Sequence, residues 1–430
     1  MKTLKYQNNL NAPEFAVLFN RTAFPEDISR SVAEILNDIQ LNGDDAVIKY
    51  AKKFDGVELD LDNLRVPQSE IDAAESLIDD DIKAAIHLAH TNITAFSKQS
   101  LPEDWKFSPR EGVTLGEKFS PLDRVACYVP GGTAPLVSTV MHTATMAQVA
   151  GVQEIVVTTK AEKDGSVNPA ILYAAKVAGA TEILRLAGVY AIAALAYGTE
   201  KIRKADKIVG PGNAYVTAAK KQVYGYCALD LVAGPSEIMV IADKTAKASF
   251  IAADLLSQAE HGSGFEQSVV VSDDADLLKA VEVETYKQAK LLKRAECVEK
   301  VLENGIFLIE VANMKEAADV ANIYAAEHLE IITEDPEAVA EDINAAGAIF
   351  LGPYTPEPVG DFVAGPSHVL PTGGAGKYFN GLTVGQFFRR TSLVKYSKEA
   401  LSKEVGAMSA FAKAEGLDAH GRSGTIRFED

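Results

Sequence analysis

A glutamine and a histidine stand three residues apart in the chain, at Gln258 and His261. They end a run, residues 245–261, in which apolar residues recur at helical spacing and after which a glycine follows. Residues three apart share one face of a helix, with Cβ atoms about 5–6 Å apart. An amide oxygen and an imidazole in that arrangement could form half of a metal site with nitrogen and oxygen ligands, and the alternative is a polar helix cap.

A glutamate and a histidine are adjacent at Glu327 and His328, between a predicted helix and a predicted strand at residues 329–333. A histidine with a pKa near its usual value of about 6.5 can take a proton from a hydroxyl, and a neighbouring carboxylate can activate a water. Both side chains could project from the strand into a cleft. The alternative is a helix-terminal glutamate and a hydrogen-bonded histidine without a chemical role.

Four further polar residues are spread over the last part of the chain. Asp361 and His368 lie in a long Gly/Pro-rich segment, residues 352–376, and Glu415 and His420 follow near the end. A segment of that length and composition inside a compact domain is typically functional. We assign no role to His368 from the sequence.

Glycine-rich turns suggest a second kind of site. The similar words GPGN, GPSE and GPSH occur at residues 210–213, 234–237 and 365–368. In open parallel sheets ligands bind beyond the strand ends, and glycine lets backbone amides approach a phosphate. Residues 128–135 and 210–213 therefore form a candidate nucleotide site, although plain tight turns are the alternative and the G-x-G-x-x-G fingerprint is absent.

These residues must be positioned by an alternation of short apolar strands and helices that begins at Leu122. Such an alternation predicts parallel sheets with right-handed crossovers. It runs twice, with a junction near Ala233, so we expect two α/β lobes side by side. A helical pattern resumes at Val384 and continues to the last residues.

Composition limits the possible functions. A net charge of −18 argues against a nucleic-acid surface, and no apolar run is long enough to span a bilayer. The first residues lack the apolar core of a signal peptide, so we expect a cytoplasmic protein without membrane or nucleic-acid partners. The three cysteines are far apart, which excludes a thiolate zinc site and leaves His, carboxylate and amide groups as metal ligands.

Eight sequence words in one order resemble a known family. They are YVPGG (128–132), AIAALAYGT (191–199), KIVGPGNAYV (207–216), DLVAGPSEI (230–238), LLSQAEHG (255–262), AEHLEI (326–331), GDFVAGPSHVLPT (360–372) and EGLDAH (415–420). From about Val32 to His420 the chain resembles the histidinol dehydrogenases. The resemblance implies a cytoplasmic enzyme of histidine biosynthesis that oxidises L-histidinol to L-histidine with two NAD⁺ and one Zn²⁺ per subunit.

The resemblance also implies a homodimer with shared active sites, in which each chain has two incomplete Rossmann-like parallel-sheet lobes and small helical terminal domains. We expect an arm at residues 1–20. Residues 21–126 and 234–380 should form the first lobe, with the metal and catalytic residues. Residues 127–233 should form the second lobe, with the NAD site, and residues 381–430 a helical tail that reaches the neighbouring subunit.

Residue roles follow from the same resemblance. The implied zinc ligands are Gln258, His261, Asp361 and His420, and the implied acid–base pair is Glu327 and His328. The implied substrate contacts are Ser236, Gln258, His261, His328, Asp361, Glu415 and His420. The implied cofactor contacts are Tyr128, Tyr190 and Asn213.

Two residues depart from the family pattern. Tyr190 stands where the family usually has a glutamine at the NAD site, and Ala326 replaces the usual proline before Glu327. The metal and acid–base residues are all present, which argues against an inactive scaffold on the same fold. A related dehydrogenase of another primary alcohol, such as a hydroxy-sulfonate, is the closest alternative.

Overall fold

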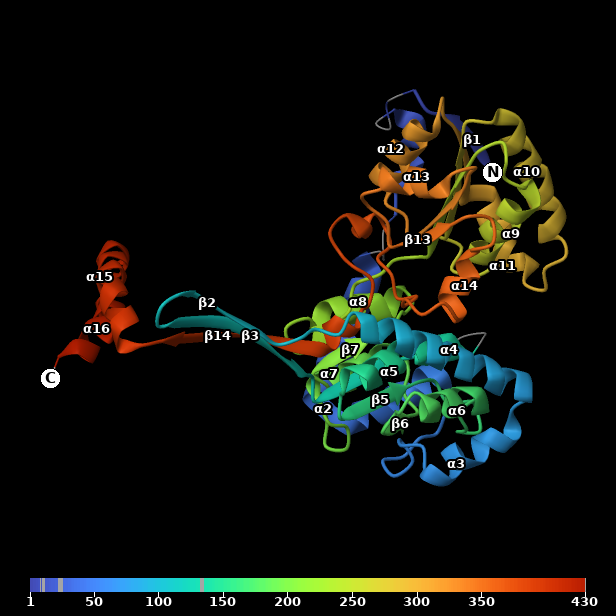
Figure 1. Cartoon of the computed structure of the whole chain (residues 1–430). Helices are drawn as coiled ribbons and strands as arrows, with labels where there is room; N and C mark the ends of the chain where they lie inside the picture. Colours follow the sequence, from blue (N-terminus) through green and yellow to red (C-terminus); the bar gives the residue numbers. More distant parts are fainter. Residues whose placement is uncertain (8, 10–11, 22–25, 132–134, 430) are drawn as a thin grey trace. The chain divides into compact units, whose positions relative to one another are not determined.

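The computed structural model of the chain describes residues 1–7, 9, 12–21, 26–131 and 135–429 (Figure 1). The chain forms two compact units. The first comprises residues 1–100 and 122–387, and the second comprises residues 101–121 and 388–430. Among the described residues, no helix has the length and apolar character that a membrane span requires.

A six-stranded parallel sheet, here called sheet A, has the strand order β1-β11-β10-β9-β12-β13. Its strands are β1 (Lys2–Lys5), β9 (Glu237–Ala242), β10 (Gln267–Ser272), β11 (Ile306–Glu310), β12 (His328–Ile332) and β13 (Ala348–Leu351). Alternate residues of the central strands enter two separate cores, one on each face of the sheet. Burial of both faces explains why these strands are almost uniformly apolar in sequence.

Helices cover both faces of sheet A. One core contains apolar residues of α9 (Ala248–Ala259), α10 (Ala275–Ala289) and α11 (Ala295–Asn304). The other contains residues of η1 (Pro13–Phe15), α1 (Ala16–Phe19) and α12 (Met314–Tyr324), with α13 (Pro336–Glu341) packed against it. The predicted α/β architecture is thus confirmed for this part of the chain.

The N-terminal segment is part of sheet A and not an arm. β1 pairs in parallel with β11 at the sheet edge, and Phe15 and Leu18 are each only 1% exposed. The Leu/Tyr alternation at the start of the sequence therefore belongs to a strand that covers an otherwise unpaired edge. Sequence polarity alone suggested an arm because the strand is short and edge side chains are largely solvated.

A five-stranded parallel sheet, sheet B, has the order β6-β5-β4-β7-β8. Its strands are β4 (Arg124–Tyr128), β5 (Glu154–Thr158), β6 (Glu182–Leu184), β7 (Lys207–Val209) and β8 (Ala228–Leu229). One face packs against α2 (Glu26–Tyr50), α7 (Gly188–Tyr197) and α8 (Ala214–Val223). Helix α5 (Val137–Ala150) packs on β4 and β5, with α4 (Asp80–Gln99) and α6 (Pro169–Val177) beside it.

The packing of α2 corrects the predicted grouping of residues 21–126 with residues 234–380. Val32, Leu36 and Ile39 of α2 share one core with sheet B and helices α7 and α8. Further along, α3 (Gln68–Ala73) and η3 (Ala74–Leu77) pack against α6 of the same lobe. An amphipathic pattern identifies which face of a helix is buried, but the pattern does not identify the sheet that buries it.

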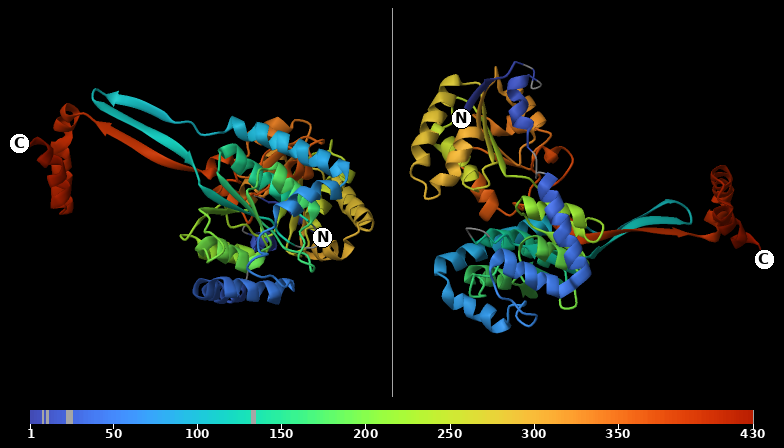
Figure 2. Two further views of the ribbon diagram at one scale, coloured as in Figure 1. Left: turned by 90° about the horizontal axis from the view of Figure 1, so that it is seen from below. Right: turned by 180° about the vertical axis from the view of Figure 1, so that it is seen from behind.

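The second unit is a three-stranded antiparallel sheet followed by helices. The strands are β2 (Trp105–Arg110), β3 (Val113–Pro121) and β14 (Phe388–Tyr396), with β3 in the centre. Figure 2 shows β3 and β14 running side by side before α15 (Lys398–Glu415) and α16 (Asp418–Thr425). The tail predicted as helical thus contains a nine-residue strand, which pairs with a segment more than 250 residues earlier in the chain.

Candidate active site and cofactor pocket

The parallel pairing of β9 and β12 brings most of the predicted catalytic and metal residues together. His328 is the first residue of β12 and stands opposite Ile238 of β9. Ser236 directly precedes β9, so both lie at the amino-terminal ends of their strands. Ligand sites in open parallel sheets usually lie at the carboxyl ends. In sheet A the candidate site residues lie at the opposite, amino-terminal ends of the strands.

The chain enters β12 through a strained turn. Helix α12 ends at Tyr324 and is capped by Ala325, which has φ 52° and is the sole non-glycine residue with positive φ in the described parts of the chain. Its N–H donates to the carbonyl of Ala321 at 2.6 Å. A left-handed alanine costs about 1–2 kcal/mol. The turn that ends α12 and sends Glu327 and His328 into the strand is therefore held by the surrounding packing.

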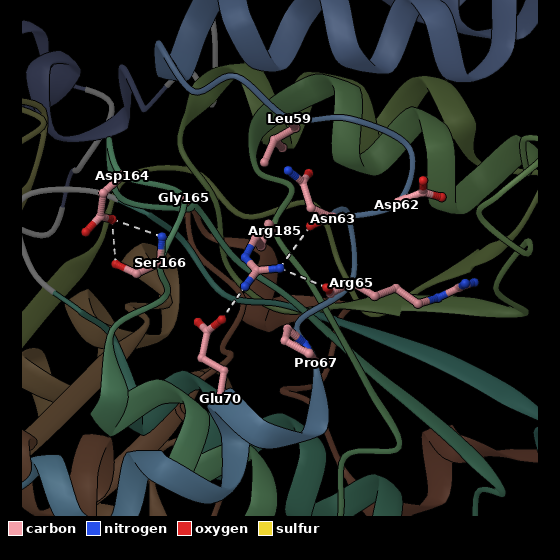
Figure 3. Close-up of a pocket in the computed structure, with 10 residues that line it drawn as sticks. All are labelled: Leu59, Asp62, Asn63, Arg65, Pro67, Glu70, Asp164, Gly165, Ser166 and Arg185. Carbon is pink, nitrogen blue, oxygen red and sulfur yellow. Dashed lines mark hydrogen bonds and ion pairs between the residues drawn. The ribbon is translucent and has the colours of Figure 1, made fainter.

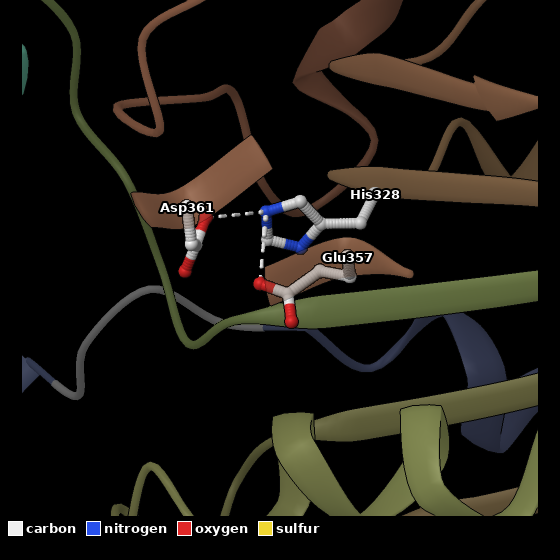
Figure 4. Close-up of side chains that lie close together, drawn as sticks. All are labelled: His328, Glu357 and Asp361. Atoms are coloured by element: carbon white, nitrogen blue, oxygen red, sulfur yellow. Dashed lines mark ion pairs between the residues drawn. The ribbon is translucent and has the colours of Figure 1, made fainter. Parts of the chain in front are cut away.

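His328 is buried, and its two ring nitrogens have different surroundings. Nδ1 lies 3.0 Å from Oε1 of Gln258 and 3.1 Å from the carbonyl oxygen of Glu237. Because both partners are acceptors, this hydrogen-bond pattern assigns a proton to Nδ1. Nε2 faces two carboxylates, with Asp361 Oδ1 at 3.5 Å and Glu357 Oε1 at 3.8 Å (Figure 4). Nε2 is thus the nitrogen available for proton exchange.

Glu327 lies on the other side of the imidazole. One of its carboxyl oxygens, Oε2, accepts the backbone N–H of Glu237 at 2.9 Å and lies 3.7 Å from Nδ1 of His328. Arg21 in turn binds the Glu237 carboxylate at 2.9 Å and lies over the ring of Tyr324. The acid–base pair is therefore positioned by a chain of contacts that begins in the N-terminal segment.

Burial and crowding shift the pKa values at this site. Burial raises the pKa of Glu327 to about 8, despite the nearby His328. Burial alone would lower the pKa of His328, but the carboxylates of Glu327, Asp361 and Glu357 outweigh it and raise the pKa to about 10. For Asp361, burial is outweighed by the contact with His328, so its pKa is lowered. Without a bound cation, the cluster therefore holds protons that its groups would release at neutral pH in water.

The structure adds a buried acidic residue that the sequence did not reveal. Glu357 opens α14 (Glu357–Phe362), one helical turn before Asp361, and only 2% of it is exposed. Its backbone N–H donates to Glu330 at 2.6 Å, and burial beside Asp361 raises its pKa to about 8. The spacing of four residues between Glu357 and Asp361 was the available signal, because it places both on one helix face.

Gln258 and His261 reach the site from the end of α9. The helix ends at Ala259, so the histidine lies just beyond it in a turn and does not share a helix face with Gln258. Nδ1 of His261 lies 3.1 Å from the hydroxyl of Ser236. The predicted neighbours thus meet at the strand ends through the turn and not through helical periodicity.

A second predicted group lines a cavity of about 620 Å³ in the lobe of sheet B. Tyr128, Tyr190 and Asn213 all line it, together with residues of α2 and of the π-helical turn η2 (Ala51–Asp55). Tyr128 ends β4, and Asn213 follows β7 and caps α8 through its Oδ1. In sheet B, in contrast to sheet A, the candidate site lies at the carboxyl ends of the strands, as expected for a nucleotide.

The turn after β7 is held against β4 by close packing and a buried ion pair. A Cβ on Gly210, which has φ 118°, would lie 2.2 Å from the carbonyl oxygen of Tyr128. Asp230 accepts the N–H of Gly210 at 2.7 Å, and Lys220 donates to the Gly210 carbonyl at 2.8 Å. The Lys220 and Asp230 side chains are 3% and 0% exposed. Glycine is required here, and the turn brings Asn213 to the cavity.

Comparisons with known proteins agree with this arrangement. The family model described as histidinol dehydrogenase matches residues 20–428. A histidinol dehydrogenase of Heliobacterium mobile is 45% identical over 412 residues, 96% of each chain, and that of Lactococcus lactis is 43% identical over the full length of both. The crystal structure of histidinol dehydrogenase from Elizabethkingia anophelis superposes with a TM-score of 0.93 at 35% identity, covering 100% of this chain and 98% of that one.

The chain belongs to the histidinol dehydrogenase family. It is therefore an oxidoreductase of the family that acts in histidine biosynthesis.

In this member of the histidinol dehydrogenase family, the donor set at the start of β12 suits a cation. In the described part of the chain, His328, Glu357 and Asp361 form a group whose ligand atoms all lie within 4.8 Å of one another. The buried Gln258 Nε2 and His328 Nε2 have no hydrogen-bond partner. Crowded carboxylates and unpartnered polar atoms are what a metal site presents without its ion.

The two remaining predicted residues lie in the second unit. Glu415 is the last residue of α15, and His420 lies in α16. Both are exposed within their own unit. The structure therefore groups Gln258, His261 and Asp361 in the first unit and presents the fourth implied zinc ligand on a separate one.

Two other features lie outside this group. His142 and His368 are buried against each other, with ring centroids 4.9 Å apart, and burial lowers the pKa of both. A cavity of about 410 Å³ surrounds Arg185, whose guanidinium contacts Glu70 and the carbonyls of Asn63 and Arg65 (Figure 3). Arg185 thus joins the loop at residues 63–65 to the end of β6 in sheet B. The polar groups at this cavity therefore have a structural role.

The raised pKa values predict how the stability of the metal-free protein depends on pH. Glu327 and Glu357 have folded pKa values of about 8, above the usual glutamate value of about 4.3. Their contribution to stability is fully present below about pH 4.3 and is lost as pH rises through 8. Glu357→Gln copies the protonated acid, so it should reduce the loss of stability between pH 5 and 8.5 by roughly 2–4 kcal/mol.

Urea unfolding of chelator-treated protein at several pH values measures this dependence. Glu341→Gln, which removes an exposed carboxylate on α13, is the matched control and should keep the wild-type slope. Identical slopes for wild type and Glu357→Gln would contradict the assignment of raised pKa values to this cluster.

Proposed function

We propose that the protein oxidises L-histidinol through bound L-histidinal to L-histidine, with two NAD⁺ and one Zn²⁺ per subunit. The observation that carries this proposal is the environment of His328 in a chain of this family. Its Nδ1 has two acceptor partners, and its Nε2 faces Asp361 and Glu357 without a hydrogen bond. A buried imidazole with one fixed nitrogen and one free nitrogen suits proton transfer to and from a bound alcohol.

The proposed zinc ligands are Gln258, His261, Asp361 and His420. Amide, imidazole and carboxylate groups are suitable zinc ligands, and no cysteine is near in sequence. Zinc does not change oxidation state, so bound there it would anchor and polarise the substrate.

Metal binding at Asp361 changes what His328 can do. The Asp361 carboxylate now faces Nε2 at 3.5 Å and favours the charged imidazole. With Asp361 bound to a cation, His328 would lose that support and its pKa would be lowered. His328 then takes the hydroxyl proton of the alcohol at Nε2 as the hydride leaves the carbon.

Glu327 is proposed to act in the second oxidation. The aldehyde must gain a water before a second hydride can leave, and a carboxylate can remove the proton from that water. With a pKa of about 8, Glu327 is poised to exchange a proton near neutral pH. The N–H of Glu237 holds one oxygen in place, which leaves the other for the water.

The remaining contacts extend the proposal to substrate, cofactor and assembly. Ser236, Glu415 and His420 would bind the substrate beside the metal ligands, and Tyr128, Asn213 and the cavity at Tyr190 would hold NAD⁺. Because Glu415 and His420 belong to a separate unit, we propose that they complete the site of the partner in a homodimer. A cytoplasmic location is part of the same proposal.

Purified protein given histidinol should form two NADH per molecule oxidised, and other primary alcohols, a hydroxy-sulfonate among them, should give little. Removal of metal with a chelator should abolish turnover, and added Zn²⁺ should restore it. Asp361→Asn should lower bound zinc as measured by elemental analysis, whereas Asp276→Asn, on an exposed helix end, should not. Full turnover by protein shown to contain no metal would refute the zinc proposal.

The two oxidations can be separated at Glu327. Glu327→Gln keeps an acceptor for the Glu237 N–H but cannot take a proton, so histidinal oxidation should slow about 100-fold or more. Histidinol oxidation to the aldehyde should slow much less, while His328→Ala should impair both. Single-turnover assays with each substrate measure the difference.

Glu330→Gln is the matched control for this experiment. Glu330 is buried in β12, three residues after Glu327, and burial beside Asp254 raises its pKa well above the usual value, so an amide copies its protonated form. The Glu330→Gln variant should keep the rates of both oxidations near those of wild type. Equal losses in both oxidations for Glu327→Gln would show that Glu327 only supports His328.

Hybrid dimers test the shared site. His261→Ala damages the first unit and His420→Ala the second, and each variant should be nearly inactive alone. After the two variants are unfolded and refolded together, about half of the dimers should be hybrids. Each hybrid then holds one intact site, so roughly a quarter of all sites should be whole. No recovery of turnover, with exchange confirmed by mass spectrometry, would mean that each tail serves its own chain.

A further inference from the structure

Tyr190, which stands where the family usually has a cofactor-binding glutamine, does not point a free hydroxyl into the cavity. Only 1% of Tyr190 is exposed. Its Oη accepts the N–H of Ala187 at 3.2 Å and donates to a carboxyl oxygen, Oδ2, of Asp55. Both hydrogen-bonding functions of the hydroxyl are therefore used within the protein. The polar group that the cavity receives at this point is the carboxylate of Asp55.

Asp55 is a built feature of the cavity and not a surface carboxylate. It ends the π-helical turn η2, and Gly56 follows in the left-handed conformation at φ 68°. Its side chain is 12% exposed and lines the cavity, with its second oxygen 3.5 Å from Nζ of Lys160. π-Helical turns recur at functional sites because they redirect side chains that a regular helix would place elsewhere.

The same turn offers a flat surface beside the carboxylate. Phe54 and Tyr50 are stacked, with ring centroids 5.6 Å apart and an interplanar angle of 6°. Both line the cavity, and Phe54 is half exposed. An exposed aromatic face next to a fixed hydroxyl acceptor matches a purine base and its ribose.

We propose that Asp55, held by Tyr190, accepts a hydroxyl of the adenosine ribose and thereby selects NAD⁺ over NADP⁺. The inference rests on the proposed NAD⁺ site and names the residue that decides its specificity. A 2′-phosphate would bring negative charge against this carboxylate and remove the hydroxyl that it binds. Tyr190 acts through Asp55, as a positioning residue.

Other charges around the cavity provide the comparison. Glu34 also lines it but is exposed on α2. Lys53 lies over the rings of Phe54 and Tyr50, and Lys160 pairs with Asp55. The two lysines attract a phosphate, and the direct contact of the ribose hydroxyl with Asp55 must outweigh this attraction for NAD⁺ to bind more tightly than NADP⁺.

Titration calorimetry of the zinc-loaded protein with NAD⁺ and NADP⁺ tests this without relying on turnover. Wild type should bind NAD⁺ at least about tenfold more tightly than NADP⁺. Asp55→Asn should reduce this ratio about tenfold, and Glu34→Gln, the same charge change at an unheld position, should keep it. 5′-AMP should bind more weakly to Asp55→Asn than to wild type. This loss would locate the contact at the adenosine half of the cofactor.

The role of Tyr190 is tested by Tyr190→Phe, which keeps the ring and removes the donor. The NAD⁺/NADP⁺ ratio should fall in this variant and should not fall further when it is combined with Asp55→Asn. If Asp55→Asn does not fold, as judged from its thermal unfolding, Tyr190→Phe alone still tests the ratio. An unchanged ratio in every variant, or equal binding of both cofactors by wild type, overturns the inference. Failure of wild type to bind either cofactor instead refutes the proposed NAD⁺ site.

Discussion

The register between β9 and β12 is the constraint on which the candidate active site depends. It sets His328 opposite Ile238, so that the backbone of Glu237 can bind both members of the acid–base pair. A slip of one residue would turn both side chains to the other face of the sheet. Burial of both faces of sheet A opposes such a slip, because the apolar residues of the strands alternate between two cores. Stability and catalytic geometry therefore share one origin.

The site concentrates negative charge in a buried place, and this concentration has a chemical purpose. Glu327, Glu357 and Asp361 surround one histidine, and Glu330 lies behind them. Burying so many carboxyl groups is unfavourable unless they bind protons or a cation. The metal-free protein uses protons and a charged His328, whereas a cation would release His328 for proton transfer. In the proposed mechanism, the acidic cluster thus couples metal binding to the acid–base function of the histidine.

The two sheets present their functional residues at opposite ends. In sheet B, the proposed cofactor cavity lies where β4 and β7 end, with the left-handed Gly210 packed on the carbonyl of Tyr128. In sheet A, the proposed catalytic residues lie where β9 and β12 begin. At the entry of β12, Ala325 occupies a left-handed conformation that its side chain disfavours. Ala326, in place of the usual proline, follows directly in the sequence, so the turn is held by packing without that ring.

The sequence by itself determined the α/β class, the alternation of strands and helices after Leu122 and the family, because periodicity and motif words are local properties. The sequence also singled out Glu327, His328, Gln258 and Asp361, and the structure brings the other three side chains around His328. Only the tertiary structure decided that α2 packs on sheet B, that Phe388–Tyr396 is a strand, and that Glu357 joins the cluster. It alone gave Tyr190 its partner, Asp55, 135 residues away. These outcomes depend on packing and strand pairing between segments far apart in the sequence. A local pattern shows that a segment has an apolar face, but it does not show which other segment buries that face.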